Sequence, residues 1–254
     1  MERHYRKAGS TGRPRRDEAM VTMRRAADRR PPPAIGVPAY FYPWPGDPGW
    51  ADLVDAPAGT LVVATPDNGP GTAPDPNYRA AIEPLAHRAI FVYGYVDSAY
   101  ASRDIITLTE EVNAWIAWYG VRAIFVDRVA ATPANRQHYS ELCGLLRRQG
   151  LQLALNPGQP RIDPSYLNLA DQVLVFEGTL AAYQAQVFPG WMDAMPRERL
   201  WHCVYEVADA EQYAEVLHKA ARCNAGVVFA TDGTMPNPWD RLPPYWPVMR
   251  RRHD

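Results

Sequence analysis

The chain has 254 residues, of which 47% are hydrophobic and 22% are charged, and its formal net charge is −1. This composition suffices for one large domain or two small ones, and no stretch approaches the ~18 consecutive apolar residues of a membrane-spanning helix. The three cysteines, Cys143, Cys203 and Cys223, are odd in number and widely spaced. That pattern argues against a disulfide framework and against a zinc site, so we expect neither a metal nor another cofactor.

The segment 1–31 differs in charge from the rest of the chain. It holds ten arginines or lysines against four acidic residues, a balance of +6 that leaves −7 for the remainder. Low apolar periodicity and three closing prolines predict a disordered basic tail over residues 1–33 and a single domain over 34–254. The tail could contact nucleic acid or a membrane, although a solvated segment, or a true start at Met20 or Met23, is the favoured interpretation. We expect no nucleic-acid binding by the domain, and the sequence specifies no oligomeric state.

Eight apolar runs follow the tail, and they are typical of parallel strands that are covered on both faces. Pro38 weakens the first of them. In chain order the runs span residues 34–42, 59–65, 89–96, 121–127, 151–156, 172–177, 199–206 and 225–231.

Helix signals lie between these runs. Asp75 before Pro76 predicts an N-cap followed by proline at the first helical position. Thr107 with Glu110 matches a capping box. Apolar residues recur at helical spacing in three segments, 112–119, 139–146 and 213–220.

Eight strands that alternate with helices predict an α/β fold of the (β/α)8 TIM-barrel type. The weakest helix signals fall at 48–55 and 164–170. A doubly wound open sheet is the alternative, but it would call for a glycine-rich phosphate turn after an early strand. The sequence holds neither a G-x-G-x-x-G motif nor a Walker A motif.

Polar and aromatic residues gather where the predicted strands end, which is where TIM barrels carry their chemistry. Tyr40, Tyr42 and Trp44 crowd the end of the first run. Aromatic faces stack on sugar rings, and carboxylates handle protons and hydroxyls, so this combination predicts a carbohydrate site. The acids and amides at these positions are Asp67, Asn68, Asp97, Asp127, Asn156, Glu177, Glu206 and Asp232.

Asp127 and Glu177 end the most apolar runs and are the candidate catalytic pair. Glycoside cleavage needs two carboxyls on opposite sides of the bond, and partial burial would split their pKa values into acid and base roles. A carboxylate at a barrel rim is more often a loop cap or an ion-pair partner. Arg128 favours that simpler interpretation, because it could neutralise a nearby acid.

Several motifs in order and at matching spacing carry a family resemblance. They are VPAYFYPWPGDPGW (37–50), TPDNGPGTAPDPNY (65–78), VYGYVDSAYASR (92–103), WYGVRAIFVDR (118–128), NPG (156–158) and LVFEG (174–178). Through them the region from about 35 to 231 resembles the spherulation-specific family 4 (spherulin-4-like) proteins. The resemblance implies a (β/α)8 barrel and a glycoside hydrolase, similar to an endo-α-1,4-galactosaminidase, that cleaves polysaccharides containing α-1,4-linked galactosamine or N-acetylgalactosamine.

The resemblance also implies roles for individual residues. The family's acids fall on Asp127, as nucleophile or its equivalent, and on Glu177, as general acid/base. His202 could face the barrel lumen and bind substrate, although a core histidine with satisfied hydrogen bonds is at least as well supported. The expected substrate-binding residues are Tyr40, Tyr42, Asn68, Tyr95, Asp97, Tyr100, Arg103, Asn156 and His202.

Two features depart from the family pattern. Family members commonly have Asp-Glu where this chain has Asp127-Arg128. Loss of that second acid could abolish activity, shift the substrate, or move its role to Asp97 or Glu206. The alternative function is therefore a sugar-binding barrel without turnover. A cation beside Asp127 is expected to lower its pKa.

The second departure is the missing secretory signal, which favours a cytoplasmic location although the family suggests secretion.

Overall fold

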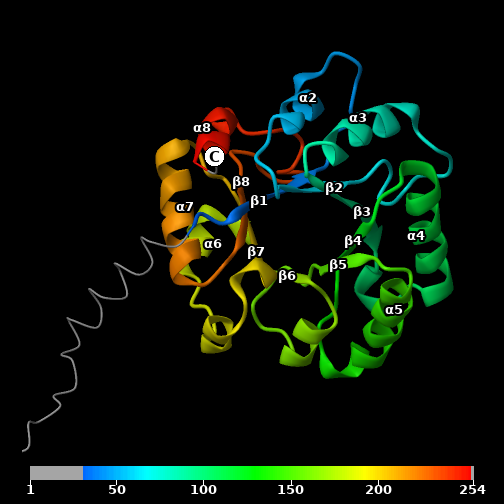
Figure 1. The fold of residues 1–254 in the computed structure, drawn as a ribbon. Helices are drawn as coiled ribbons and strands as arrows, with labels where there is room; N and C mark the ends of the chain where they lie inside the picture. The colour runs from blue at the N-terminus through cyan, green and yellow to red at the C-terminus, as the bar shows by residue number, and fades with distance from the viewer. Residues whose placement is uncertain (1–30, 253–254) are drawn as a thin grey trace, which may run out of the picture. The chain divides into compact units, whose positions relative to one another are not determined.

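The computed structural model describes residues 31–252, so all but the last three residues of the predicted tail lie outside the described residues. Within them, eight parallel strands form a closed barrel in chain order, and β8 pairs with β1 to complete it (Figure 1). The predicted (β/α)8 barrel is confirmed. The strands are β1 (Ala34–Ala39), β2 (Leu61–Ala64), β3 (Phe91–Asp97), β4 (Ala123–Asp127), β5 (Gln152–Leu155), β6 (Gln172–Thr179), β7 (Leu200–Tyr205) and β8 (Val227–Ala230).

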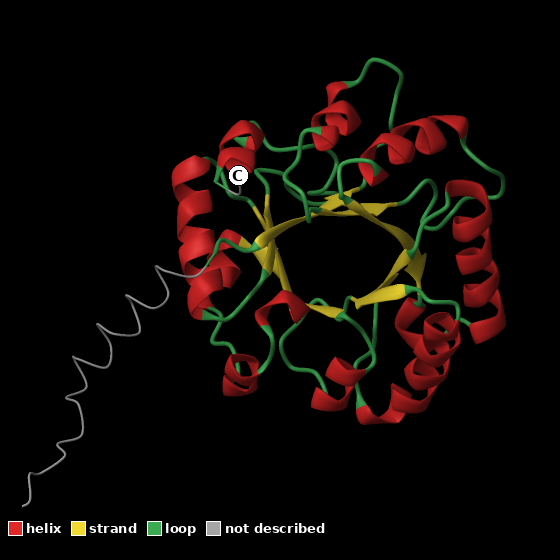
Figure 2. Ribbon diagram, in the orientation of Figure 1, coloured by secondary structure: helices red, strands yellow, loops and turns green. Residues whose placement is uncertain are grey.

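Helices surround the ring of strands (Figure 2). The α-helices are α2 (Pro48–Val54), α3 (Pro76–Ala86), α4 (Ile105–Tyr119), α5 (Arg136–Arg148), α6 (Leu180–Ala185), α7 (Ala210–Arg222) and α8 (Trp246–Arg251). The 3₁₀ helices are η1 (Ala99–Ala101), η2 (Pro133–Asn135), η3 (Pro164–Asn168), η4 (Gly190–Ala194) and η5 (Arg197–Arg199). The short η3 takes the place of an α-helix between β5 and β6, where the helical pattern is weak. Across residues 31–252, no helix has the length and apolar character needed to cross a lipid bilayer.

The two predicted helix starts have different outcomes. Asp75 caps α3 as expected, because its Oδ1 accepts hydrogen bonds from the backbone N–H groups of Asn77 and Tyr78 over 2.8 and 3.1 Å. The prediction that Thr107 and Glu110 form a capping box is wrong. Asp104 is the N-cap of α4, and its Oδ1 accepts from the Thr107 backbone N–H over 2.8 Å. Thr107 already lies inside the helix.

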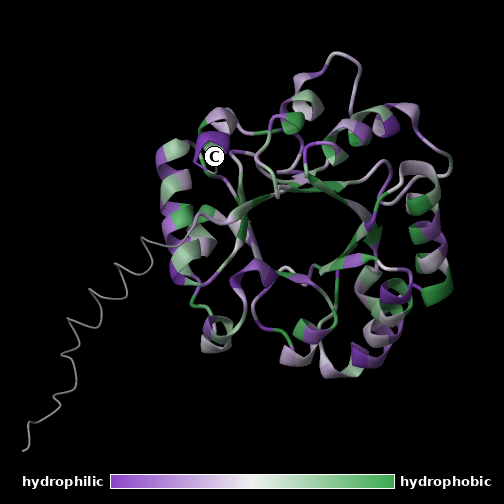
Figure 3. Ribbon diagram, in the orientation of Figure 1, coloured by the Kyte–Doolittle hydropathy of each residue, from purple (hydrophilic) through white to green (hydrophobic). Residues whose placement is uncertain are grey.

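Aromatic side chains fill the barrel, and glycines make room for them. Trp201 packs edge-on against Phe125, with ring centroids 5.5 Å apart, and a Cβ at Gly36 would overlap its indole. Outside the barrel, a Cβ at Gly94 would lie 2.5 Å from the ring of Trp115 in α4. Hydrophobic residues run along the strands, while the helices alternate between hydrophobic and hydrophilic positions (Figure 3). The barrel is therefore a packed core that supports side chains at its carboxyl end.

Candidate active site

A cavity of about 890 Å³ lies at the carboxyl ends of the strands, the end at which TIM barrels carry their active sites. Residues at or after the ends of β1 to β7 line it, together with the loop 235–239 that follows β8. The structure brings together seven of the eleven predicted site residues in this lining: Tyr40, Asn68, Tyr95, Tyr100, Asp127, Asn156 and Glu177.

Asp127 and Glu177 share one hydrogen-bond donor. The Nδ2 amide of Asn156 donates to Asp127 Oδ1 over 2.6 Å and to Glu177 Oε2 over 2.9 Å. Because both bonds meet at the same nitrogen, these two carboxyl oxygens can be no farther apart than the two bonds laid end to end. The ends of β4, β5 and β6 thus hold two acids and one amide as a connected group.

Burial governs the protonation of both acids. It raises the pKa of Asp127, although hydrogen bonds from the Tyr95 hydroxyl, the Arg128 backbone and Asn156 offset part of the shift. The Tyr95 hydroxyl donates to Asp127 Oδ2 over 2.8 Å. The pKa of Asp127 is therefore raised overall, against the expectation that a neighbouring cation lowers it, because desolvation outweighs the hydrogen bonds.

Glu177 is also shifted toward its protonated form. Burial raises its pKa, and the negative charge of Asp127 raises it further. Donors from Asn156 and Trp239 act in the opposite direction. The Trp239 indole N–H lies 3.3 Å from Glu177 Oε1, so each carboxyl oxygen of Glu177 has a donor. A buried acid that keeps its proton can serve as a general acid.

Aromatic rings form much of the cavity wall. Tyr40 packs edge-on against Tyr95 with centroids 5.7 Å apart, and Tyr205 packs edge-on against Trp239 at 6.0 Å. Tyr100 stands at the lip with 61% of its surface exposed. These rings offer apolar faces on several sides of the two acids.

Arg128 lines the cavity directly after Asp127 but pairs with a different acid. Its Nε donates to Asp97 Oδ1 over 2.7 Å, and its Nη2 bonds to the other oxygen of that carboxylate. Burial alone would raise the pKa of Asp97, but the hydrogen bonds from Arg128 and the Ala99 backbone lower it overall. Asp97 does not line the cavity, and its carboxylate contacts the site through its bonds to Arg128.

Three further predicted residues, Tyr42, Arg103 and His202, lie away from the cavity. Tyr42 donates to Asp75 Oδ2 over 2.8 Å, beside the start of α3. Arg103 forms an ion pair with Glu111 of α4, and its Nη1 also donates to the Asp97 carbonyl. Both side chains therefore support the loops around the site and do not line it.

The expectation that His202 faces the lumen is wrong. His202 is fully buried, and its ring stacks on Phe188 at 4.6 Å, while its Nδ1 pairs with the Tyr183 hydroxyl over 2.9 Å. Alternation along β7 points Trp201 and Cys203 to one face and His202 to the other, toward α6. Burial lowers the pKa of His202 to about 3, so this imidazole is neutral near physiological pH.

Tyr205 and Trp239 contribute to the site more than sequence reasoning suggests. Tyr205 is the last residue of β7, and its position at a strand end could have identified it. The sequence favours a packing role for Trp239, and the residue is indeed buried. Its indole N–H nevertheless donates to Glu177. The loop that carries it has no periodic pattern from which this contact could be predicted.

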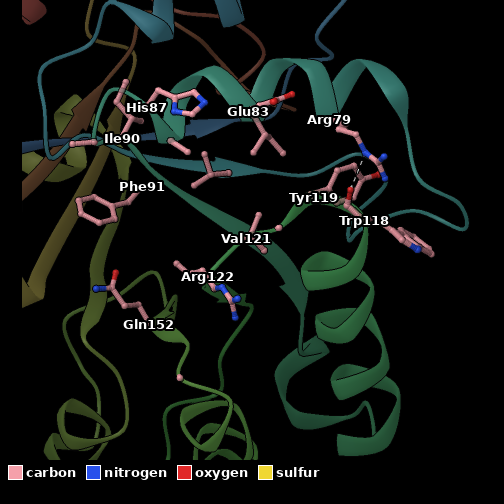
Figure 4. Close-up of a pocket in the computed structure, with 17 residues that line it drawn as sticks. Arg79, Glu83, His87, Ile90, Phe91, Trp118, Tyr119, Val121, Arg122 and Gln152 are labelled. Atoms are coloured by element: carbon pink, nitrogen blue, oxygen red, sulfur yellow. Dashed lines mark hydrogen bonds between the residues drawn. The ribbon is translucent and has the colours of Figure 1, made fainter.

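A second hollow, of about 780 Å³, lies at the opposite end of the barrel (Figure 4). It runs between α3 and α4 beside the amino ends of β3, β4 and β5. Among the described residues that line it, Glu83 is the one carboxylate, so it lacks the pair of acids found in the first cavity. No cluster of three or more potential metal-binding His, Cys, Asp or Glu residues occurs within residues 31–252.

Comparison with known families settles the lineage of the chain. The model of spherulation-specific family 4 matches residues 34–251. The chain belongs to this family. No curated protein sequence matches the family 4 chain.

Solved structures share the fold of this family 4 chain. Sph3 of Aspergillus clavatus, solved in complex with GalNAc, is 26% identical with a TM-score of 0.75, over 88% of this chain and 98% of that one. Active domain 2 of the thermostable chitinase from Pyrococcus furiosus, complexed with chito-oligosaccharides, is 11% identical with a TM-score of 0.52. That match covers 88% of the family 4 chain and 95% of the chitinase domain, and it shows a common fold.

Proposed function

We propose that the chain is a glycoside hydrolase that cleaves polysaccharides containing galactosamine or N-acetylgalactosamine. Asp127 and Glu177 are its two catalytic carboxyls in this proposal. The observation that carries it is their shared donor, since Asn156 holds both acids close together in a cavity walled by aromatic rings. Family membership and the GalNAc complex of Sph3 support a carbohydrate-active role and point to the sugar class.

The separation of the acids favours a retaining reaction. Retaining enzymes place their carboxyls about 5–5.5 Å apart, whereas inverting enzymes need about 6.5–9.5 Å to admit a water molecule. The bridged oxygens are joined through one nitrogen by bonds of 2.6 and 2.9 Å, and even laid end to end these bonds do not reach the inverting range. We therefore infer the retaining manner for this pair, in which the second carboxyl attacks the sugar directly.

In the first step, Glu177 donates its proton to the glycosidic oxygen while Asp127 attacks the anomeric carbon. The glycosidic C–O bond breaks, the shortened polymer leaves as an alcohol, and the sugar remains as an ester of Asp127. In the second step, the Glu177 carboxylate takes a proton from water, and the water oxygen displaces Asp127. Both acids return to their starting states, and the mechanism requires Glu177 to be protonated and Asp127 to be ionised at the outset.

Other cavity residues have supporting roles in this proposal. Tyr40, Tyr95 and Trp239 offer ring faces or edges to the sugar that lies between the acids. Asn68 and Tyr100 also belong to the lining, where their polar groups can meet sugar hydroxyls. Asn156 positions the two acids through its amide.

The test is incubation of the wild-type protein with acetylated and de-N-acetylated galactosaminogalactan, beside the variants Asp127→Asn and Glu177→Gln. Each variant keeps the size of the side chain and removes its acid function. We expect the wild type to release oligosaccharides and both variants to lose at least a thousandfold in rate. Equal product from wild type and variants would refute the assignment of the two acids.

The Arg128–Asp97 pair also supports a second candidate, a barrel that binds oligosaccharide without turnover. Arg128 belongs to the cavity lining and its guanidinium is bonded to Asp97, so this side chain can restrict how a sugar approaches the acids. Under this alternative the wild type binds the polymer and releases no product. Product analysis and binding measured on the same samples separate the two candidates.

A further inference from the structure

The guanidinium of Arg128 has one side occupied and one side unused. Nε and Nη2 bind Asp97, and the group lies over the Tyr100 ring at 5.6 Å from its centroid. Among residues 31–252, nothing accepts a hydrogen bond from Nη1. The Arg128 side chain is 46% exposed and belongs to the cavity lining, whereas the Asp97 side chain is 15% exposed. Nη1 is therefore an available donor on the lip of the active-site cavity.

The surrounding backbone holds this pair in place. Ala99, Tyr100 and Ala101 all have positive φ angles, of 44°, 58° and 70°, and Arg128 itself has φ of 50°. Such angles are unfavourable for residues other than glycine and persist only where neighbours impose them. Here the Tyr100 N–H donates to the Arg128 carbonyl over 2.8 Å.

A second set of bonds ties this loop to the catalytic strand. The Ser98 hydroxyl lies 2.8 Å from the Asp127 carbonyl and 2.9 Å from the Arg128 carbonyl. The Ala99 N–H donates to Asp97 Oδ1 over 2.7 Å. These bonds hold the Asp97 carboxylate and the backbone that carries Arg128 beside the end of β4.

The pair determines the charge at this side of the cavity. Asp67, Asp127 and Glu177 already bring carboxyl groups to the lining. Without Arg128, Asp97 would add one more unpaired negative charge, and the lip would attract a cationic sugar. With Arg128 present, the charge of Asp97 is cancelled, and Nη1 offers a donor in its place. A carbonyl oxygen can accept from that donor, but a protonated amine has donors only and no acceptor.

We propose that the Arg128–Asp97 pair is the specificity-determining element of this site, selecting sugar units that carry an acetamido group over units with a free ammonium group. The Arg128 Nη1 group donates to the amide carbonyl of the acetylated unit. The ammonium of a de-N-acetylated unit has no acceptor for this N–H, so in that unit a donor faces a donor and the hydrogen bond is lost. This inference rests on the proposed function, because it assigns the substrate preference of the same cavity.

Removing the charge of each member of the pair in turn tests the proposed preference. Arg128→Gln leaves Asp97 unpaired, so the cavity lip becomes more negative. Asp97→Asn leaves Arg128 unpaired, so the lip becomes more positive. Binding of matched N-acetylgalactosamine and galactosamine oligosaccharides is measured by calorimetry in a Glu177→Gln background, which removes turnover from the reading. The buffer has low salt and a pH at which the free amines are protonated.

We expect the Glu177→Gln protein with the intact pair to bind the acetylated oligosaccharide more tightly than the galactosamine oligosaccharide. Arg128→Gln removes a positive charge near the ligand and is expected to lower that preference by about tenfold. Asp97→Asn removes a negative charge and is expected to increase the preference. The double substitution Arg128→Gln with Asp97→Asn removes both charges and is expected to fall between the two. Raising the salt concentration is expected to shrink all of these differences.

Two outcomes overturn the proposal in distinguishable ways. If the protein with the intact pair binds neither oligosaccharide, the proposed function fails and the specificity assignment fails with it. If it binds oligosaccharide but Arg128→Gln and Asp97→Asn shift the preference in the same direction, or not at all, the pair has a structural role only. Thermal melting of each variant shows that the comparison is made between folded proteins, and Arg128→Lys retains the charge and is expected to retain much of the preference.

Discussion

Asp127 and Glu177 stand fifty positions apart in the chain, yet they accept hydrogen bonds from the same Asn156 nitrogen. The closed barrel makes this possible, because β4, β5 and β6 are neighbours whose carboxyl ends meet at one face. Asn156 follows the strand between the two that carry the acids. Its amide therefore lies between the two acids and reaches both.

Asn156→Ala tests the importance of this bridge. The substitution removes a donor from each acid, so the two carboxyls lose their fixed separation and their shared partner. We expect kcat/KM on acetylated galactosaminogalactan to fall by about 10²–10³-fold, the range found for loss of one well-placed donor. Asn77→Ala is the matched control, because the Asn77 amide donates to the Tyr42 hydroxyl outside the cavity. Equal losses in the two variants would contradict a specific role for Asn156.

Tyr95→Phe is expected to change how activity responds to acid. The Tyr95 hydroxyl lowers the pKa of Asp127, so its removal raises that pKa. Asp127 must be ionised to attack the sugar, and the acidic limb of the kcat/KM profile should therefore move to higher pH, by about one unit. Tyr93→Phe serves as the control, since the Tyr93 hydroxyl bonds to Gln172 in the barrel interior. An acidic limb that stays in place or moves to lower pH would count against Asp127 as the ionised group.

Trp239→Phe is expected to shift the basic limb of the profile of kcat/KM against pH. The Trp239 N–H lowers the pKa of Glu177, so its loss raises that pKa. A general acid with a higher pKa keeps its proton longer as pH rises, and the basic limb should move to higher pH. Trp246→Phe removes an indole bond to the Asp52 carbonyl and is the matched control. A basic limb that moves down, or does not move, would remove Glu177 from the acid role.

His202 should make the stability of the fold depend on pH. Its pKa is about 3 in the folded state against 6.5 in the unfolded chain, so the unfolded chain binds one more proton between these values. The stability that His202 contributes is complete above pH 6.5 and is lost as pH falls toward 3, with a slope of up to about 1.4 kcal/mol per pH unit.

Urea denaturation at several pH values measures this dependence. His202→Leu should flatten the wild-type slope in that window, because the titrating group is gone. Tyr183→Phe loses the hydrogen bond to His202 and should lower stability while it keeps the slope. If wild type and His202→Leu have the same slope between pH 3 and 6.5, His202 is not buried in its neutral form.

The barrel itself was predictable from the sequence, because buried parallel strands leave continuous apolar runs that alternate with amphipathic helices. The cap of α3 was predictable for a similar reason, since Asp75 and Pro76 have strong local preferences. The start of α4 was not, because Thr107 and Asp104 are both good capping residues and the capping box favoured the wrong one. Local chemistry alone does not decide between two such neighbours.

The site was predictable in position more than in detail. Strand ends bring Asp127, Asn156 and Glu177 to one rim, and their placement follows from the order of the strands. The direction in which His202 points depends on the register of β7, which short apolar runs do not specify. The partner of Arg128 was likewise hidden, because Asp97 lies on the neighbouring strand and the pairing requires the unusual backbone of the 98–101 loop.

The most direct measurement of the two catalytic roles is azide rescue of Asp127→Gly and Glu177→Gly on an aryl α-glycoside of an N-acetylgalactosamine oligosaccharide. With Asp127 removed, azide can take the place of the nucleophile, and the account predicts a β-glycosyl azide. With Glu177 removed, azide can attack the sugar ester on Asp127, and the account predicts an α-glycosyl azide. The reversed pair of products, or full activity of either variant without azide, would contradict the account.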